Sequence, residues 1–358
     1  MRISYVLPLR SSAPQLDAEF TGYLRRIAER AELLVVDGSP PEVFAAHRAA
    51  WGSFARHLPV DPELATPNGK VGGVLTGVRH ASHERVVIAD DDVRYDPASL
   101  AAVAAALDHA EVVRPQNYFA PLPWHALWDT GRILLNRATD GDWPGTLAVR
   151  RSALLATGGY DGGVLFENLE LVRTVVAAGG RERLAREVLV LRRPCDASHF
   201  YGQRVRQAYD EFARPGRLAV QLAVVPAVAA LAASGRWGTL VAAAAAAAVA
   251  ALAEAGRRRD GGTRVFPAGA SLLAPGWLLE RGVCAWLAVG RRLLRGGVRY
   301  RDSTLRRAAT PVRELRRRHA GALSSTSTSI GLNEPLLDSS AEHAVTPTTM
   351  SISARSSR

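Results

Sequence analysis

Three consecutive aspartates, Asp90, Asp91 and Asp92, follow the short apolar run Val86–Ile88 after a single alanine, Ala89. A run of this length and composition predicts a buried strand of a parallel sheet, and ligands of open α/β sheets bind beyond the carboxyl ends of such strands. Adjacent carboxylates repel one another unless a cation lies between them. The triplet therefore predicts a site for a hard divalent cation such as Mg²⁺, the alternative being a solvated acidic turn.

Alternating strands and helices must position this triplet, and the pattern favours a doubly wound α/β domain. The N-terminal segment enters a strand at once and has no signal-peptide core, so we expect the first domain to remain in the cytoplasm. The expected strands are 3–7 (closed by Pro8), 33–36, 86–90, 111–114 and 147–149, and the expected helices are 16–31, 43–54, 71–81 and 97–109.

Further residues suited to chemistry stand near these predicted strand ends. Lys70 opens a predicted helix, where a cation and free N–H groups suit a phosphate, although an ordinary surface lysine is the alternative. Glu167 and Glu170 share one helix face, where they also suit the helix dipole. The segment 117–142 reads as an irregular substrate-lining loop. The first strand–helix turn has no Gly-x-Gly-x-x-Gly, which argues against a dinucleotide-binding Rossmann domain. Gly69-Lys70 lacks the rest of a Walker A loop, which excludes a P-loop NTPase.

Two uncharged segments, 218–233 and 237–253, predict a transmembrane hairpin, with a soluble Ala-rich hairpin as the alternative. Arginines on both sides fit a hairpin that enters from the cytoplasm and returns to it. A third apolar segment, 265–289, is interrupted by Glu280 and Arg281. If it spanned the membrane, the Arg-rich stretch after it would lie outside, so we expect a re-entrant or interfacial placement.

The formal charge of +11 is concentrated near the C-terminus. Residues 291–318 contain 11 arginines and two acidic residues, a net charge of +9. A basic amphipathic stretch suits an anionic membrane surface, and the lack of interleaved aromatics argues against a nucleic-acid partner. The two cysteines, Cys195 and Cys284, suggest no disulfide framework or zinc site. The resulting division is a catalytic domain (1–213), a transmembrane hairpin (214–256), a third apolar and basic region (263–318) and a disordered Ser/Thr-rich tail (319–358).

Several short motifs occur in an order that resembles a known family. They are Val6-Leu7-Pro8, Val35-Val36-Asp37-Gly38-Ser39, Gly69-Lys70 with Leu75-Thr76-Gly77, Ala89-Asp90-Asp91-Asp92-Val93, Phe166-Glu167-Asn168-Leu169-Glu170-Leu171, Gln203-x-x-Arg206 and Gly297-Val298-Arg299-Tyr300-Arg301. Over residues 1–301 the chain resembles family 2 glycosyltransferases of the GT-A fold. Within that family it is similar to the membrane-bound branch related to ceramide glucosyltransferase.

The resemblance implies an inverting transfer from a nucleotide-sugar donor, most simply a UDP-sugar, to a hydroxyl of a lipid-linked or glycan acceptor. The protein would be a multi-pass cell-membrane protein, built as a GT-A doubly wound nucleotide-sugar-binding domain followed by C-terminal membrane helices. The implied roles are Asp90 and Asp92 as ligands of Mg²⁺ or Mn²⁺, Glu167 as general base with Glu170 second, and Pro8, Asp37, Lys70, Asp90, Gln203 and Arg206 as substrate-binding residues.

Two positions depart from the family pattern. Asn168 stands where the family usually has the Asp that serves as general base, and an amide cannot take up a proton as a carboxylate does. Gln207 stands where a stacking Trp would follow Arg206. A membrane-anchored nucleotide-sugar-binding protein without turnover is therefore an alternative, and a basic membrane scaffold is a third reading.

Overall fold

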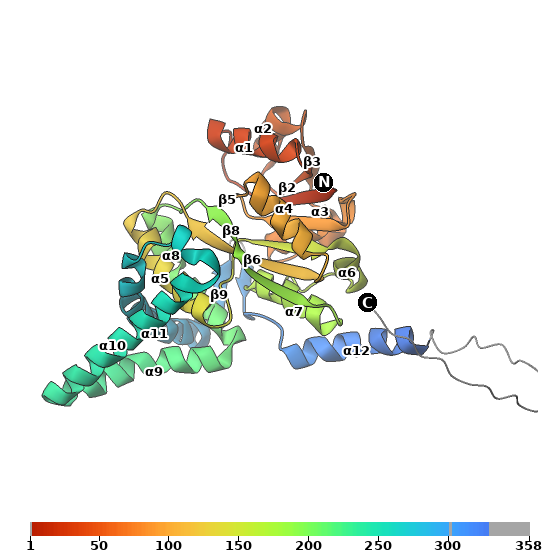
Figure 1. The fold of residues 1–358 in the computed structure, drawn as a ribbon. Coiled ribbons are helices and arrows are strands. Elements are labelled where there is room, and N and C mark those ends of the chain that lie inside the picture. Colours follow the sequence, from red (N-terminus) through yellow and green to blue (C-terminus); the bar gives the residue numbers. More distant parts are fainter. Residues whose placement is uncertain (1, 301–302, 329–358) are drawn as a thin grey trace, which may run out of the picture.

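An eight-stranded mixed sheet organises the N-terminal half of this computed structural model, which describes residues 2–300 and 303–328 (Figure 1). The strands lie in the order β3-β2-β1-β4-β7-β6-β8-β5. Their bounds are β1 Ile3–Leu9, β2 Glu32–Asp37, β3 Arg56–Pro59, β4 Arg85–Ala89, β5 Val93–Arg94, β6 Val112–Phe119, β7 Thr146–Arg150 and β8 Glu182–Arg192.

Helices cover both faces of the sheet, as the alternating pattern predicts. Alternate residues of β1 point to opposite faces, so that Tyr5 and Leu7 belong to one core cluster and Val6 to the other. The first face is covered by α1 (Ala18–Ala28), α2 (Pro41–Trp51) and α4 (Pro97–Ala106). The second face is covered by α3 (Gly69–His80), α6 (Arg151–Ala156) and α7 (Glu167–Ala177).

Strand β4 lies at the centre of the sheet and ends at the aspartate triplet. It is parallel to β1 and antiparallel to β7. Because β1, β2 and β4 are parallel, their carboxyl ends meet at one edge, as expected for a ligand site. Strand β1 does not close at Pro8 as predicted but continues to Leu9. Strand β4 pairs only as far as Val6, so a proline beyond that point removes no ladder hydrogen bond on the β4 side.

The prediction of an irregular loop over 117–142 was wrong for most of that segment. Strand β6 runs to Phe119, and residues Trp124–Ala138 form the 15-residue helix α5. The helix buries Ile133 and Leu134 against Phe266 and Ala270. These partners follow more than 120 residues later, which is why the local polar and aromatic composition gave no indication of a packed helix.

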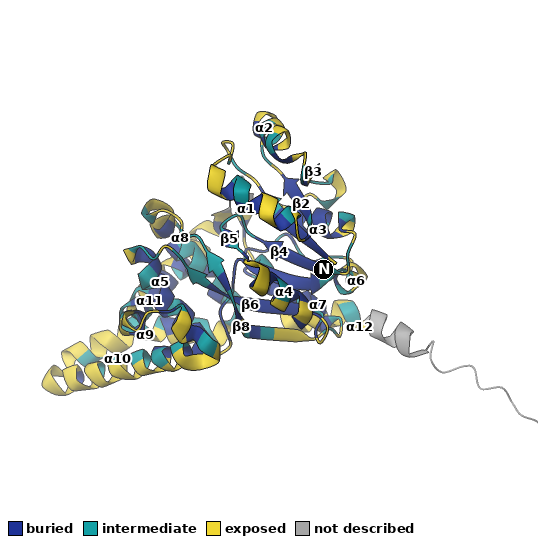
Figure 2. Cartoon of the chain, turned by 45° about the horizontal axis from the view of Figure 1, so that its top comes forward, coloured by how far each residue is buried: buried dark blue, intermediate teal, exposed yellow. Residues whose placement is uncertain are grey.

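The C-terminal half is helical. Helices α8 (Ala197–Tyr209), α9 (Pro215–Ala233), α10 (Gly235–Arg258) and α11 (Gly269–Arg295) follow one another along the chain. Three of them, α9, α10 and α11, are long and apolar enough to cross a membrane. Helices α9 and α10 form a hairpin that projects from the body, and its surface is mostly exposed (Figures 1 and 2).

Helix α11 is continuous through Glu280 and Arg281, the two charged residues that interrupt the apolar segment in the sequence. Both side chains face the protein. Glu280 accepts hydrogen bonds from Trp128 (2.5 Å) and Arg204 (2.6 Å), and Arg281 is 3% exposed. The opposite face exposes large apolar side chains, namely Leu272, Leu279, Val283, Trp286, Leu287, Leu293 and Leu294. Helix α11 is therefore amphipathic, with polar groups toward helices α5 and α8.

The chain after α11 returns to the first domain. It forms a two-stranded hairpin (β9 Val298–Tyr300 and β10 Ser303–Leu305) and the basic helix α12 (Val312–Thr328), which begins directly after Pro311. The first ten residues of the predicted tail, 319–328, thus belong to α12, and residues 329–358 lie outside the described residues.

Candidate active site

A pocket of about 200 Å³ lies between the carboxyl edge of the sheet and helices α5, α8 and α11. It is lined by Asp90, Arg132, Asn136, Trp143, Pro144, Gly145, Leu165, Phe166, Glu167, Asn168, Arg192, Arg206, Gln207, Asp210, Glu211, Arg214, Arg217, Trp277 and Arg281. Of the predicted site residues, Asp90, Glu167 and Arg206 therefore line one cavity, as does Asn168.

Lys70 joins two of the predicted carboxylates. Its Nζ lies 2.6 Å from Oδ1 of Asp90 and 2.8 Å from Oε1 of Glu167. Burial opposes the charge of the Lys70 ammonium, but Asp90 and Glu167 outweigh this effect and hold its pKa above the ordinary value. Asn68 positions the lysine, because it caps helix α3 by accepting the N–H of Lys70. Lys70 is also the only lysine in the 358-residue sequence.

Asp92 has a different partner. Its Oδ2 lies 2.8 Å from Nε of Arg192, whose guanidinium is 3.9 Å from Oδ2 of Asp90. Within the described residues, Oδ1 of Asp92 is buried without a hydrogen-bond partner. Burial raises the pKa of Asp92, Arg192 opposes this, and Asp90 adds to it. An orphaned buried oxygen beside a second carboxylate fits a divalent cation, and carboxylate oxygens of this kind are ligands that Mg²⁺ or Mn²⁺ prefers.

Gly145 leaves room for this arrangement. A Cβ at position 145 would lie 2.8 Å from Oδ2 of Asp90 and 3.2 Å from Cζ of Arg192. The backbone of Gly145 is itself fixed, since its N–H donates to Asn117 and its carbonyl accepts the N–H of Asp90. A side chain here must therefore displace the pocket carboxylate.

We expect Gly145→Ala to lower turnover about 10- to 100-fold, because a shift of about 1 Å in a reacting geometry can cost that much. Gly69→Ala is the matched control, since a Cβ at position 69 meets no described atom within 4 Å. Steady-state rates of the two variants test the expectation. Equal rates would show that the packing around Asp90 is not critical.

Asn168 lines the pocket but does not serve as a proton acceptor. Its side-chain amide donates to the carbonyl of Pro144 at 2.9 Å. A carboxylate could not donate this bond. The amide at this position therefore fixes the loop that carries Gly145.

Glu170 points away from the pocket, unlike Glu167. The residue is fully buried, and its Oε2 accepts the backbone N–H of Thr310 at 2.7 Å. Burial raises its pKa, which the bond from Thr310 partly offsets. Glu170 thus contacts the C-terminal segment that precedes α12, and it does not line the pocket as Glu167 does.

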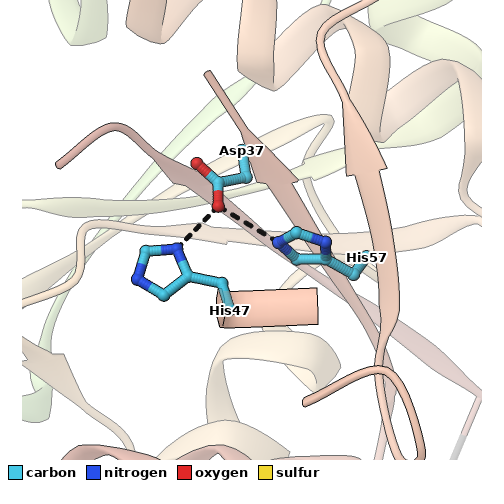
Figure 3. Close-up of side chains that lie close together, drawn as sticks. All are labelled: Asp37, His47 and His57. Atoms are coloured by element: carbon cyan, nitrogen blue, oxygen red, sulfur yellow. Dashed lines mark hydrogen bonds and ion pairs between the residues drawn. The ribbon is translucent and has the colours of Figure 1, made fainter. Parts of the chain in front are cut away.

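Asp37 lies at the end of β2 and is 2% exposed. Figure 3 shows its Oδ2 between two imidazoles, 2.7 Å from Nδ1 of His47 and 3.1 Å from Nε2 of His57, while Oδ1 accepts the N–H of Ser39. Burial disfavours the charged form, but the bonds from His57, Ser39 and His47 lower the pKa of Asp37 below its ordinary value. The carboxylate is thus satisfied by protein groups and does not line the pocket.

The Asp37, His47 and His57 side chains are close enough to hold a metal ion, but the hydrogen bonds favour another arrangement. The backbone N–H of Gln15 points to Nε2 of His47 at 2.9 Å, so Nε2 is an acceptor. The ring hydrogen then lies on Nδ1, which donates to Asp37 and has no lone pair for a metal. We assign the cluster as a hydrogen-bonded support for the end of β2.

Of the remaining predicted residues, Pro8, Gln203 and Arg206, only Arg206 lines the pocket. Pro8 is half-buried beside Gly73 of α3, where an added Cβ would come within 3.0 Å of it. Gln203 and Arg206 lie on one face of α8, but only Arg206 lines the pocket.

Several lining residues carried no sequence motif. Arg192 ends β8, Asp210 begins a short 3-10 helix (Asp210–Ala213) after α8, and Arg214 precedes α9. Trp277 and Arg281 come from α11. These positions share no local sequence signal, and only the fold brings them to the same cavity.

No family model matches the chain, and no curated protein matches it. Solved structures similar to it include a mannosyltransferase from Pyrobaculum calidifontis in complex with GDP-Man and Mn²⁺ (17% identity, 92% of this chain and 87% of that one, TM-score 0.45). Two others are TarS of S. aureus with UDP-GlcNAc (14%, 56% and 61%, TM-score 0.39) and glucosyl-3-phosphoglycerate synthase of Mycobacterium tuberculosis with Mn²⁺, UDP-Glc and phosphoglyceric acid (18%, 55% and 73%, TM-score 0.39).

Proposed function

We propose that the chain is a membrane-bound, cation-dependent glycosyltransferase that moves a sugar from a nucleotide-sugar donor to a lipid-linked or glycan hydroxyl, with inversion. One observation carries the proposal. Lys70 bridges Asp90 and Glu167, which line one pocket, and the neighbouring Asp92 keeps a buried carboxylate oxygen without a partner in the described part of the chain.

The residues divide the work as follows. Asp90 and Asp92 would hold Mg²⁺ or Mn²⁺, and a bound cation would neutralise the diphosphate leaving group. Lys70 and Arg192 add positive charge next to these carboxylates, where phosphate oxygens would lie. Arg206 reaches the same pocket from α8. A pocket carboxylate, Glu167 by family resemblance, would take the proton of the acceptor hydroxyl.

A nucleotide-sugar-binding protein without turnover is the second candidate, favoured by the amide at Asn168. Incubating membranes that contain the protein with a panel of labelled nucleotide sugars, followed by lipid extraction, separates the two. We expect label from one donor, with UDP-sugars first, to enter the lipid or glycan fraction. Binding without transfer in every acceptor extract would support the second candidate.

We further propose the domain division 1–213 (catalytic), 214–256 (transmembrane hairpin) and 263–318 (interfacial and basic region), with the catalytic domain on the cytoplasmic side. The C-terminal segment pairs with the catalytic domain through its backbone carbonyls. The Leu165 N–H donates to the carbonyl of Arg307 at 3.0 Å, and the Phe166 N–H donates to that of Ala308 at 2.8 Å. The Tyr209 hydroxyl donates to the carbonyl of Arg306. Segments that pair in this way must lie on one side of a membrane. The chain between them therefore crosses an even number of times.

Burial favours α9 and α10 as the crossing pair. Within the apolar 18-residue stretch of each helix, the buried share is 6% in α9 and 11% in α10, against 33% in α11. Helix α11 is also tied to the catalytic domain through Glu280 and Arg204. An interfacial α11 would keep these contacts and turn its exposed leucines toward lipid.

Single cysteines test this topology with a membrane-impermeant maleimide, in a background that lacks Cys195 and Cys284. We expect Arg316→Cys on α12 to react from the same side as Arg48→Cys on α2, and Gly235→Cys at the hairpin tip to react from the other side. Reaction of the α12 cysteine from the side opposite to the α2 cysteine would contradict an even number of crossings.

A further inference from the structure

The base predicted from the sequence is already engaged. Oε1 of Glu167 lies 2.8 Å from Nζ of Lys70, so protonating Glu167 would weaken that ion pair. Asn168 cannot accept a proton, and Glu170 faces Thr310. Glu211 is paired with Arg214 at 2.7 Å.

Asp210 is placed differently. It begins the 3-10 helix that follows α8 and lines the same pocket as Asp90 and Glu167. Its Oδ1 is buried, and the described residues provide no hydrogen-bond partner for that atom. Buried polar atoms are nearly always paired, so an unpaired oxygen on a side chain that lines a pocket points to a ligand that pairs with this carboxylate.

We propose that Asp210 is the general base, and that Glu167 instead holds Lys70 in place. This inference rests on the proposed function. In the step, the acceptor hydroxyl gives its proton to the carboxylate of Asp210 while the hydroxyl oxygen forms a bond to the anomeric carbon of the donor. The bond from that carbon to the diphosphate breaks, and the nucleoside diphosphate leaves with the electron pair. The sugar ends on the acceptor oxygen with inverted configuration.

The charged groups around Asp210 suit this role. Arg206 approaches from α8, Glu167 from α7, Glu211 from the same 3-10 turn and Arg214 from the start of α9. Burial raises the pKa of Asp210 to about 7; Arg206 opposes the rise, and Glu167 adds to it. A general base with a pKa near the working pH is partly ionised and is still basic enough to take the proton from a hydroxyl.

The pH dependence of kcat in full-length protein tests the proposal. Below about pH 7 the Asp210 carboxyl is protonated and cannot accept, so wild-type kcat should rise with pH through this range. We expect Asp210→Asn to lose this rise and to lower kcat about 100-fold or more. Glu167→Gln should keep the rise while weakening donor binding. A rise that persists in Asp210→Asn but disappears in Glu167→Gln would overturn the proposal.

Two further variants keep the result decisive. Asp108→Asn removes an exposed carboxylate that pairs with Arg85 and should behave as wild type. If Asp210→Asn fails to fold, Asp210→Glu retains a carboxylate and should shift the midpoint of the rise; an unchanged midpoint would reject Asp210. Wild-type protein that transfers no sugar from any donor would contradict the proposed function itself, whereas normal transfer by Asp210→Asn would contradict only this inference.

Discussion

Asp92→Asn should abolish cation-dependent turnover while leaving the protein folded and membrane-bound. The substitution removes the carboxylate whose Oδ1 has no partner among the described residues, and with it one of the two anionic donors that follow β4. Loss of a preorganised charge-stabilising element costs about 10²–10³-fold in rate. Rates measured across a Mg²⁺ and Mn²⁺ titration check the expectation.

Asp91→Asn is the matched control for this experiment. The side-chain carboxylate of Asp91 accepts a 3.3 Å bond from Gln15, and the 2.6 Å bond from Arg94 goes to the backbone carbonyl of Asp91, which the substitution keeps. Asp91 should therefore be the most tolerant of the three aspartates. If Asp92→Asn retained wild-type rate and wild-type cation dependence, the cation site would have to lie elsewhere.

Lys70→Arg should also reduce kcat/KM about 100-fold, although it keeps the charge. The ammonium fits between two carboxylates at 2.6 and 2.8 Å, and a planar guanidinium cannot occupy that space as a point charge does. The chain otherwise uses arginine wherever it needs a cation, which makes the one lysine informative. Donor affinity and kcat, measured separately, show whether the loss falls on binding or on turnover.

The reverse change provides the control. Arg48→Lys on the exposed side of α2 replaces a guanidinium by an ammonium away from the pocket and should leave both constants unchanged. Full activity in Lys70→Arg would mean that charge alone suffices at this position. The pairing of Asp90 with Glu167 through Lys70 would then have no catalytic role.

The sequence predicted the parts of the site that lie at regular strand and helix ends. The apolar run before Asp90 is strand β4, and Lys70 opens helix α3 as expected. Both predictions rest on patterns that lie within a few neighbouring residues of the sequence. That Lys70 would pair with Glu167, 97 residues later, depends on the packing of α3 and α7 on one face of the sheet, and no local pattern contains that information.

The errors and omissions have the same origin. Helix α5 was missed because the partners that bury its apolar side come from α10 and α11. Glu280 read as an interruption of a membrane segment because its partner Arg204 is 76 residues away. Asp210 had no motif at all, and only the convergence of α7, α8 and α9 makes it a pocket residue. The sequence thus predicts the edge of the sheet where the pocket lies better than it predicts the side chains that line the pocket.

The sole lysine permits the most direct measurement of the central claim, that this pocket binds a nucleotide sugar with a divalent cation. Incorporation of [ε-¹³C]lysine into the full-length protein labels only Lys70, so the labelled NMR signal comes from the side chain that contacts Asp90 and Glu167. We predict that a nucleotide sugar with Mn²⁺-free Mg²⁺ shifts the Lys70 signal, that chelation of the cation reverses the shift, and that Asp92→Asn prevents it. A Lys70 signal that no nucleotide sugar in the panel moves, with or without the cation, would contradict the account.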